Sequence, residues 1–178
     1  MNLIFRFLLT INATSWMLVI YAIKENWTLC NISARTFGML LLLVPVLLSL
    51  ISIWTACHLG SDSLSGCEEF TLADNEFLPV YLGYFFLSVG IEENTTMLFL
   101  YIIVFVFTFL SQTQYFNPIF LLFGYHYYHI LTPHGTRVFV IAKGKVVRNQ
   151  KDISFSNLKR INDTTYIDIY SKKRRRMR

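Results

Sequence analysis

"TTMLFLYIIVFVFTFL", from Thr95 to Leu110, contains no charged residue and is apolar at nearly every position. A second apolar stretch, "FLPVYLGYFFLSVGI" from Phe77 to Ile91, precedes it, and only three residues separate the two. Two of those three are Glu92 and Glu93, whose charges are too costly to leave in the hydrocarbon of a bilayer. The two stretches therefore predict a tight helical hairpin whose tip touches water.

The amino-terminal part of the chain contains two longer apolar stretches, 3–23 and 37–57. A helix of about 20 mostly apolar residues crosses the roughly 30 Å of hydrocarbon in a bilayer, so both stretches are long enough. The first also looks like a signal peptide, but no small-x-small cleavage site follows Ile23, and we interpret it as a retained span. We predict four spans, near 3–23, 37–57, 77–91 and 95–110, within a transmembrane region of residues 1–114.

The composition agrees with this interpretation. Of the 178 residues, 54% are hydrophobic and 16% are aromatic, which a water-soluble domain of this length rarely tolerates. The predicted fold class is an integral membrane α-helical protein with about four spans and a small α+β module at the carboxyl-terminal end.

The stretch 115–131, "YFNPIFLLFGYHYYHIL", has two interpretations. It is broken by Pro118 and Gly124 and ends in alternating Tyr and His, a composition typical of a membrane–water interface. We favour an interfacial aromatic segment, and a fifth span is the alternative. An odd number of spans would move the amino terminus and the Cys57–Cys67 loop to the other side of the membrane.

Charge sets the expected orientation. Residues 132–178 hold 13 of the 16 Lys and Arg against three Asp, a balance of +10, and the tail ends in "KKRRRMR". Positively charged segments near spans stay on the cytoplasmic side, so we predict a cytoplasmic carboxyl terminus. With four spans, Cys57 and Cys67 then face the cytoplasm as free thiols.

Beyond residue 131 the pattern predicts a small basic cytoplasmic module, 132–171, followed by a polybasic tail, 172–178. "RVFVIA" and "KVVR" favour a β-hairpin around "KG". "SFSNLKRI" places Phe155, Leu158 and Ile161 at helical spacing, and "TYIDIY" alternates as a strand does. About 40 residues are near the lower limit for an independent core, so we expect this module to need a membrane, a sister subunit or a partner.

Two groups of residues resemble catalytic or metal sites without matching one. His126 and His129 are three residues apart and could share a helix face with His134 as a third ligand, but no Asp or Glu lies near them in sequence. "CHLGSDSLSGCEE", from Cys57 to Glu69, matches no zinc or protease spacing. No nucleotide-binding or hydrolase motif occurs. We predict no catalytic residue, no metal, no cofactor and no enzymatic activity.

Small residues within the predicted spans mark candidate helix-packing faces, within or between subunits. They are Ser49, Ser52, Ala56, Gly83 and Gly90. Asn12, Thr14 and Ser15 form a polar cluster in the first span, and we expect it to bond neighbouring helices rather than to line a pore. We expect a homo-oligomer.

The basic residues of the carboxyl-terminal part are the candidate partner-docking site. They are Lys143, Lys145, Arg148, Lys159, Arg160, Lys172, Lys173, Arg174, Arg175 and Arg176. Such a surface can contact anionic lipid, an acidic protein or nucleic acid. Because the spans already anchor the chain, lipid contact leaves the charge almost redundant, and we favour docking of a partner.

The layout of four spans followed by "GYHYYHI", "RVFVIAKGKVVR" and "NLKRINDTTYIDI" resembles the KwaA family, the membrane subunits of the Kiwa anti-phage defence system of bacteria. The resemblance covers essentially the whole chain. It implies a non-enzymatic sensor and scaffold in the bacterial inner membrane, which assembles with KwaB, a cytosolic DNA-binding effector. Nucleic acid would then be met only through that partner. The alternative function is a pore-forming effector that depolarises the infected cell.

Overall fold

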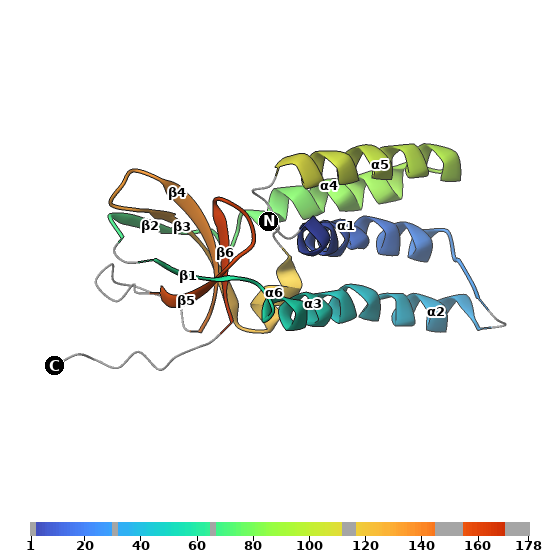
Figure 1. Cartoon of the computed structure of the whole chain (residues 1–178). Helices are drawn as coiled ribbons and strands as arrows, with labels where there is room; N and C mark the ends of the chain where they lie inside the picture. The colour runs from blue at the N-terminus through green and yellow to red at the C-terminus, as the bar shows by residue number, and fades with distance from the viewer. Residues whose placement is uncertain (1–2, 30–31, 65–66, 112–116, 145–154, 170–178) are drawn as a thin grey trace. The chain divides into compact units, whose positions relative to one another are not determined.

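The computed structural model describes residues 3–29, 32–64, 67–111, 117–144 and 155–169 (Figure 1). The chain divides into two compact units. A helical unit comprises residues 6–52 and 75–119, and a sheet unit comprises the first five residues with residues 53–74 and 120–178.

The helical unit is built from α1 (Leu3–Lys24), α2 (Ala34–Leu41), most of α3 (Leu43–Ala56), α4 (Phe77–Gly90) and α5 (Asn94–Ser111). α1, α5 and the continuous run from Ala34 to Ala56 are each long and apolar enough to cross a membrane. α4 has 14 residues and is shorter. Helices thus occupy the four stretches that the hydropathy marks.

α1 has more of its residues buried than the other helices of this unit: 56% of its apolar window is buried, compared with 6% for α5. Met17 and Tyr21 of α1 pack with Tyr84 of α4 and Met97 of α5. Hydroxyl groups add bonds between the same helices, because Ser88 of α4 donates to the carbonyl oxygen of Met17 at 2.8 Å. α1 therefore forms the core against which α4 and α5 pack.

The sheet unit contains one six-stranded sheet with the order β1-β5-β6-β4-β3-β2. Its strands are β1 (Ser61–Leu64), β2 (Glu69–Leu72), β3 (Tyr125–Leu131), β4 (Arg137–Lys143), β5 (Phe155–Arg160) and β6 (Thr165–Asp168). All neighbouring strands are antiparallel except β4 and β6, which are parallel. The short helix α6 (Pro118–Leu122) leads into β3.

The sheet is strongly curved, as its connections require. β1 and β2 are its two edge strands, yet only four residues join Leu64 to Glu69. Those residues can span at most about 18 Å, whereas the edges of a flat six-stranded sheet lie about 24 Å apart. One face of the curved sheet carries a core that includes Tyr128, Val140 and Leu158, with Cys67 packed against it.

Three of the sequence predictions are corrected here. The alternative of a helical fifth span over 115–131 is wrong for residues 125–131, which form β3, because Tyr and His alternate with the period of a strand and β3 pairs with β4 along its length. The favoured interpretation, an interfacial aromatic segment, stays a prediction. The predicted helix in "SFSNLKRI" is strand β5, whose partners on both sides override the helical spacing. The module also begins well before residue 132, since β1 and β2 belong to its sheet.

The predicted strands in "RVFVIA" and "TYIDIY" are confirmed as β4 and β6. The proposed hairpin partner "KVVR" lies outside the described residues, as does the tail 172–178. The observed neighbours of β4 are β3 and β6.

Candidate functional site

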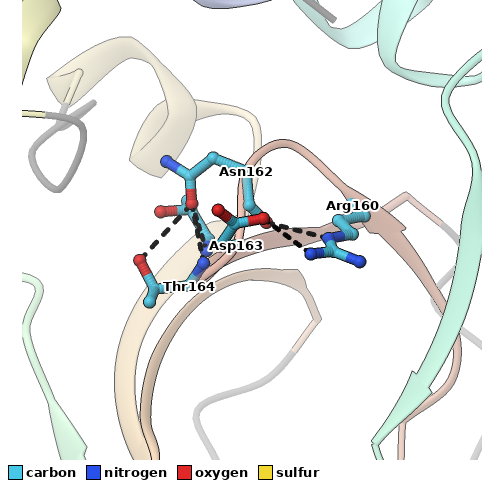
Figure 2. Close-up of polar contacts among 5 residues, drawn as sticks. Arg160, Asn162, Asp163 and Thr164 are labelled. Atoms are coloured by element: carbon cyan, nitrogen blue, oxygen red, sulfur yellow. Dashed lines mark hydrogen bonds and ion pairs between the residues drawn. The ribbon is translucent and has the colours of Figure 1, made fainter. Parts of the chain in front are cut away.

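The turn between β5 and β6 is fixed by a buried side chain, that of Asn162 (Figure 2). Its Oδ1 accepts the backbone N–H groups of Thr164 at 2.9 Å and of Thr165 at 2.7 Å. Asn commonly closes turns in this way, because its short side chain reaches backbone donors two or three residues ahead. The turn thus holds the two charged side chains beside it in a defined place.

Those side chains are Arg160 and Asp163, whose Nη2 and Oδ1 atoms lie 2.7 Å apart (Figure 2). Arg160 Nε also donates to the carbonyl oxygen of Asn162 at 3.3 Å. The hydrogen bond to Asp163 raises the pKa of Arg160, which stays charged. The pair is exposed and adds little to stability, so its main effect is to orient a guanidinium at the surface.

Arg160 and Asp163 line a pocket of about 470 Å³ together with residues that precede β1. The pocket is lined by His58, Leu59, Gly60, Arg160, Ile161, Asn162 and Asp163. Beside it, Lys159 Nζ donates to the carbonyl oxygen of Leu59 and to Ser61 Oγ, both at 2.9 Å. Lys159 therefore helps to hold the edge strand β1 on β5.

The structure distributes the described docking candidates over both faces of the sheet. Lys159 pairs with Ile167, and Ile167 pairs with Ile141, two residues before Lys143. Because side chains alternate along a strand, Lys143 and Lys159 share one face and Arg160 lies on the other. Lys143 is exposed, with its Nζ 5.4 Å from the centre of the Tyr125 ring.

The remaining docking candidates fall outside the described residues. They are Lys145, Arg148, Lys172, Lys173, Arg174, Arg175 and Arg176. The described part of the site therefore offers two cations on one face and an oriented guanidinium on the other, groups that bind carboxylates or phosphates.

The three histidines do not converge on one point. His126 and His129 lie on opposite faces of β3, because three residues apart in a strand means opposite sides. His129 packs against the Phe139 ring at 5.2 Å, and His134 is exposed. No group of three His, Cys, Asp or Glu side chains able to hold a metal ion occurs among the described residues.

His126 does have an acidic partner, which sequence reasoning missed. Its Nδ1 lies 2.7 Å from Asp74 Oδ2, and the other oxygen of Asp74 accepts the N–H of Tyr127 at 2.8 Å. Asp74 is 52 residues away in sequence, so only the pairing of β2 with β3 could reveal the contact. The arrangement ties the segment between β2 and α4 to strand β3.

The Cys57–Glu69 loop is also more ordered than its sequence suggests, since β1 lies within it and β2 begins at its end. Cys57 is exposed and Cys67 is half-buried, and the two are not joined by a disulfide. Burial raises the pKa of Cys67, and its Sγ lies 3.1 Å from the carbonyl oxygen of Glu69. Glu68 and Glu69 are exposed at the start of β2.

A buried polar cluster in the helical unit joins α1 and α3 to the residue before α6. Asn117 Nδ2 donates to Asn12 Oδ1 at 2.7 Å and to Ser49 Oγ at 3.1 Å, and Asn117 Oδ1 accepts the N–H of Ile119 at 2.9 Å. All three polar side chains are at most 1% exposed. Thr14 Oγ1 lies 3.2 Å from the Tyr101 hydroxyl. The prediction that this part of α1 bonds neighbouring segments is confirmed.

The helix-packing candidates divide into two groups. Ser49, Ser52 and Ala56 are fully buried. Gly83 and Gly90 have open space where a side chain would project, so neither packs closely against another described residue. Packing of these glycines between subunits stays a prediction.

The structure defines a class of protein in which a bundle of membrane-type apolar helices is joined to a curved mixed sheet. A family model described as anti-phage protein KwaA matches residues 5–167. The chain therefore belongs to the KwaA family of anti-phage proteins. Searches of curated proteins and of solved structures gave no significant match.

Proposed function

We propose that this chain is a four-span inner-membrane protein whose two termini are both cytoplasmic. The pairing of the strands supports this topology. β2 pairs with β3, β1 pairs with β5, and all four strands belong to one sheet. A single sheet lies on one side of a membrane, and the chain between Leu72 and Tyr125 therefore crosses an even number of times. α4 and α5 supply two crossings.

The distribution of charge gives the direction. The sheet unit and the tail carry most of the Lys and Arg, whereas the connections at 25–33 and 91–93 carry Glu25, Glu92 and Glu93. Cationic segments stay in the cytoplasm during insertion, which places the sheet unit there. Two crossings, by α1 and by α2 with α3, then return the amino terminus to the same side.

We further propose that the chain acts in anti-phage defence as a sensor and scaffold that recruits a cytosolic DNA-binding effector of the KwaB kind. Membership of the family is the observation that carries this proposal. The described cations Lys143 and Lys159 share a face, and the polybasic tail adds charge in the same part of the chain. Assembly as a homo-oligomer would multiply these contacts through avidity.

The test is a pair of glutamine variants made in the full-length protein. One replaces Lys172, Lys173, Arg174, Arg175 and Arg176. The other replaces Lys143, whose Nζ lies over the Tyr125 ring. Arg137→Gln, an exposed position at the opposite end of β4, is the control. Co-purification of the effector from mild detergent and protection against phage are measured for each.

If the basic residues dock the partner, the tail variant loses most of the co-purified effector, Lys143→Gln loses part of it, and Arg137→Gln keeps it all. The amount of effector that co-purifies with the unmodified chain should also fall steeply with added salt, because ion pairs are screened over about 8 Å at physiological ionic strength. If the tail variant keeps all of the co-purified effector and protects fully against phage, the tail does not dock the partner and acts only as a topology signal.

A further inference from the structure

Side-chain contacts in the helical unit fix the relative heights of α1, α4 and α5. On α5, the Phe109 carbonyl oxygen accepts a hydrogen bond from Arg6 Nη2 at 3.0 Å, and the Tyr101 hydroxyl meets Thr14. On α4, the short side chain of Ser88 reaches the Met17 carbonyl oxygen. α5 therefore runs antiparallel to α1, and Ser88 lies level with Met17.

One end of the common apolar zone is marked by Arg6. Its side chain is 4% exposed, and its guanidinium lies 5.0 Å from the centre of the Phe109 ring. Phe77 precedes Ser88 by 11 residues, and Arg6 precedes Met17 by the same number, so α4 begins level with Arg6. Glu76 immediately precedes α4.

The other end is marked by the connection between α4 and α5. The Tyr21 hydroxyl donates to Asn94 Oδ1 at 3.0 Å, and Lys24 Nζ donates to the Ile91 carbonyl oxygen at 2.6 Å. Glu92 and Glu93, between these two contacts, are exposed. Charged and strongly polar groups therefore lie at both ends of α4 and α5.

The distance between these boundaries is short for a bilayer. Arg6 and Tyr21 are 15 residues apart on α1, which corresponds to about 22 Å of helix. The 14 residues of α4 give about 21 Å independently. A typical bilayer has about 30 Å of hydrocarbon. The run from Ala34 to Ala56, with 23 residues, is long enough for that thickness. α5 has 18 residues in all, so the shortfall concerns α4 and the part of α5 between Asn94 and Phe109, whose contacts with α1 mark the two boundaries.

α4 and α5 also expose large apolar side chains. Phe86 of α4 is 67% exposed, and Phe99 and Phe107 of α5 are 64% and 68% exposed. We propose that the face formed by α4 and α5 fits a bilayer locally thinned to about 22 Å, so that lipids with short or flexible acyl chains are its preferred partners. This inference rests on the proposal that the helices cross a membrane, and not on the docking of an effector. It gives the proposed sensor a physical variable, bilayer thickness, to which its helical unit responds.

The experiment uses the full-length chain in vesicles of dimyristoleoyl, dipalmitoleoyl, dioleoyl or dieicosenoyl phosphatidylcholine, in order of increasing thickness. Thermal unfolding is followed by the fluorescence of Trp16, Trp27 and Trp54. The unmodified chain should have its highest midpoint temperature in one of the two thinner bilayers. Glu92→Leu/Glu93→Leu lengthens the apolar zone and should move the optimum towards dioleoyl lipid. The control, Glu68→Leu/Glu69→Leu, makes the same charge change in the sheet unit and should leave the optimum unchanged.

An optimum of the unmodified chain in dioleoyl or thicker lipid, or equal midpoints in all four, would overturn the inference. So would an optimum that stays unchanged in the Glu92→Leu/Glu93→Leu variant. If that variant fails to insert, the midpoint temperatures of the unmodified chain in the four lipids are sufficient to test the inference. Extraction of the chain by alkaline carbonate would instead reject membrane crossing itself, which separates the two failures.

Discussion

The helical unit and the sheet unit place their large apolar side chains in opposite ways. In the centre of α5, Ile102 and Ile103 are each 48% exposed, whereas in the centre of β4 Val140 and Ile141 are fully buried. An apolar surface of this extent is unfavourable in water and costs nothing in lipid. The contrast fits the proposal that lipid surrounds one unit and water the other.

The two units also differ in how their polar groups are hydrogen-bonded. In the helical unit, the buried side chains of Asn12, Ser49 and Asn117 bond one another, as required where no water is present to replace a missing partner. The sheet unit leaves two edge strands, β1 and β2, without a second neighbour in the described sheet. Edge strands are tolerated in water, which hydrogen-bonds their outer groups, but not in hydrocarbon.

The largest expected effect concerns which side of the membrane each cysteine faces. Single-cysteine chains that keep Cys30, Cys57 or Cys67 are treated with a membrane-impermeant maleimide in intact spheroplasts and in inverted vesicles. Four spans with a cytoplasmic sheet predict labelling of Cys30 only in spheroplasts and of Cys57 only in inverted vesicles. Cys67 should share the side of Cys57 but react more slowly, because burial raises its thiol pKa. Labelling of Cys57 and Cys67 from opposite sides of the membrane would contradict the proposal that the whole sheet unit lies in the cytoplasm.

A lysine placed on each unit compares the two solvents directly. Ile103→Lys, near the middle of α5, should destabilise the inserted chain by about 3 kcal/mol, because charge is costly at the centre of a bilayer. Leu72→Lys on β2 is the matched change, since Leu72 is 44% exposed and Ile103 is 48% exposed. It should cost about 0.5 kcal/mol or less. Folded yield and thermal unfolding in lipid measure both. Equal costs would mean that the two units meet the same solvent.

The helices could be predicted from sequence because apolar composition alone specifies them. Long uncharged stretches such as 95–110 have few alternatives to a helix in hydrocarbon, and their ends were marked by Glu92 and Glu93. Long apolar stretches bounded by charged residues thus allowed the positions of these helices to be predicted without any knowledge of their contacts.

The sheet was less predictable because its strands are defined by partners distant in sequence. β1 and β2 are short and polar, and only their pairing with β5 and β3 makes them strands. The contacts of Asp74 with His126 and of Asn117 with Asn12 join residues 52 and 105 positions apart. No local spacing signals such contacts, although Asn117 stands before a proline in a largely apolar stretch.

The buried polar cluster offers a third test, inside the helical unit. Asn117→Leu keeps the approximate size of the side chain but removes its bonds to Asn12, Ser49 and the N–H of Ile119. Unsatisfied buried groups cost about 1–3 kcal/mol, so we expect a loss of about 2 kcal/mol in thermal unfolding. Ser111→Ala, an exposed change near the end of α5, is the control. If both variants unfold at the same temperature, the cluster contributes nothing to the stability of this unit.

The smallest effect at neutral pH compares one tyrosine in each unit. Tyr125 of β3 is 1% exposed, and its hydroxyl has no hydrogen-bond partner within the described ranges. Tyr125→Phe removes an unpaired buried hydroxyl and should stabilise the chain by about 1 kcal/mol. Tyr21→Phe in α1 removes a hydroxyl that bonds Asn94 and should destabilise it by about the same amount. Thermal unfolding in detergent compares the two.

Alkaline pH should widen the difference between the unmodified chain and Tyr125→Phe. Burial, followed by the nearby Cys57 and Asp168, raises the pKa of Tyr125 from 10.0 to about 12. Because the folded chain holds this proton more tightly than the unfolded chain, the contribution is complete below pH 10.0 and is lost as the pH rises towards about 12. The loss is about 1.4 kcal/mol for each pH unit within that window. Tyr125→Phe lacks the titrating group, so its advantage should grow with pH, whereas a constant advantage would show that Tyr125 reaches water in the folded chain.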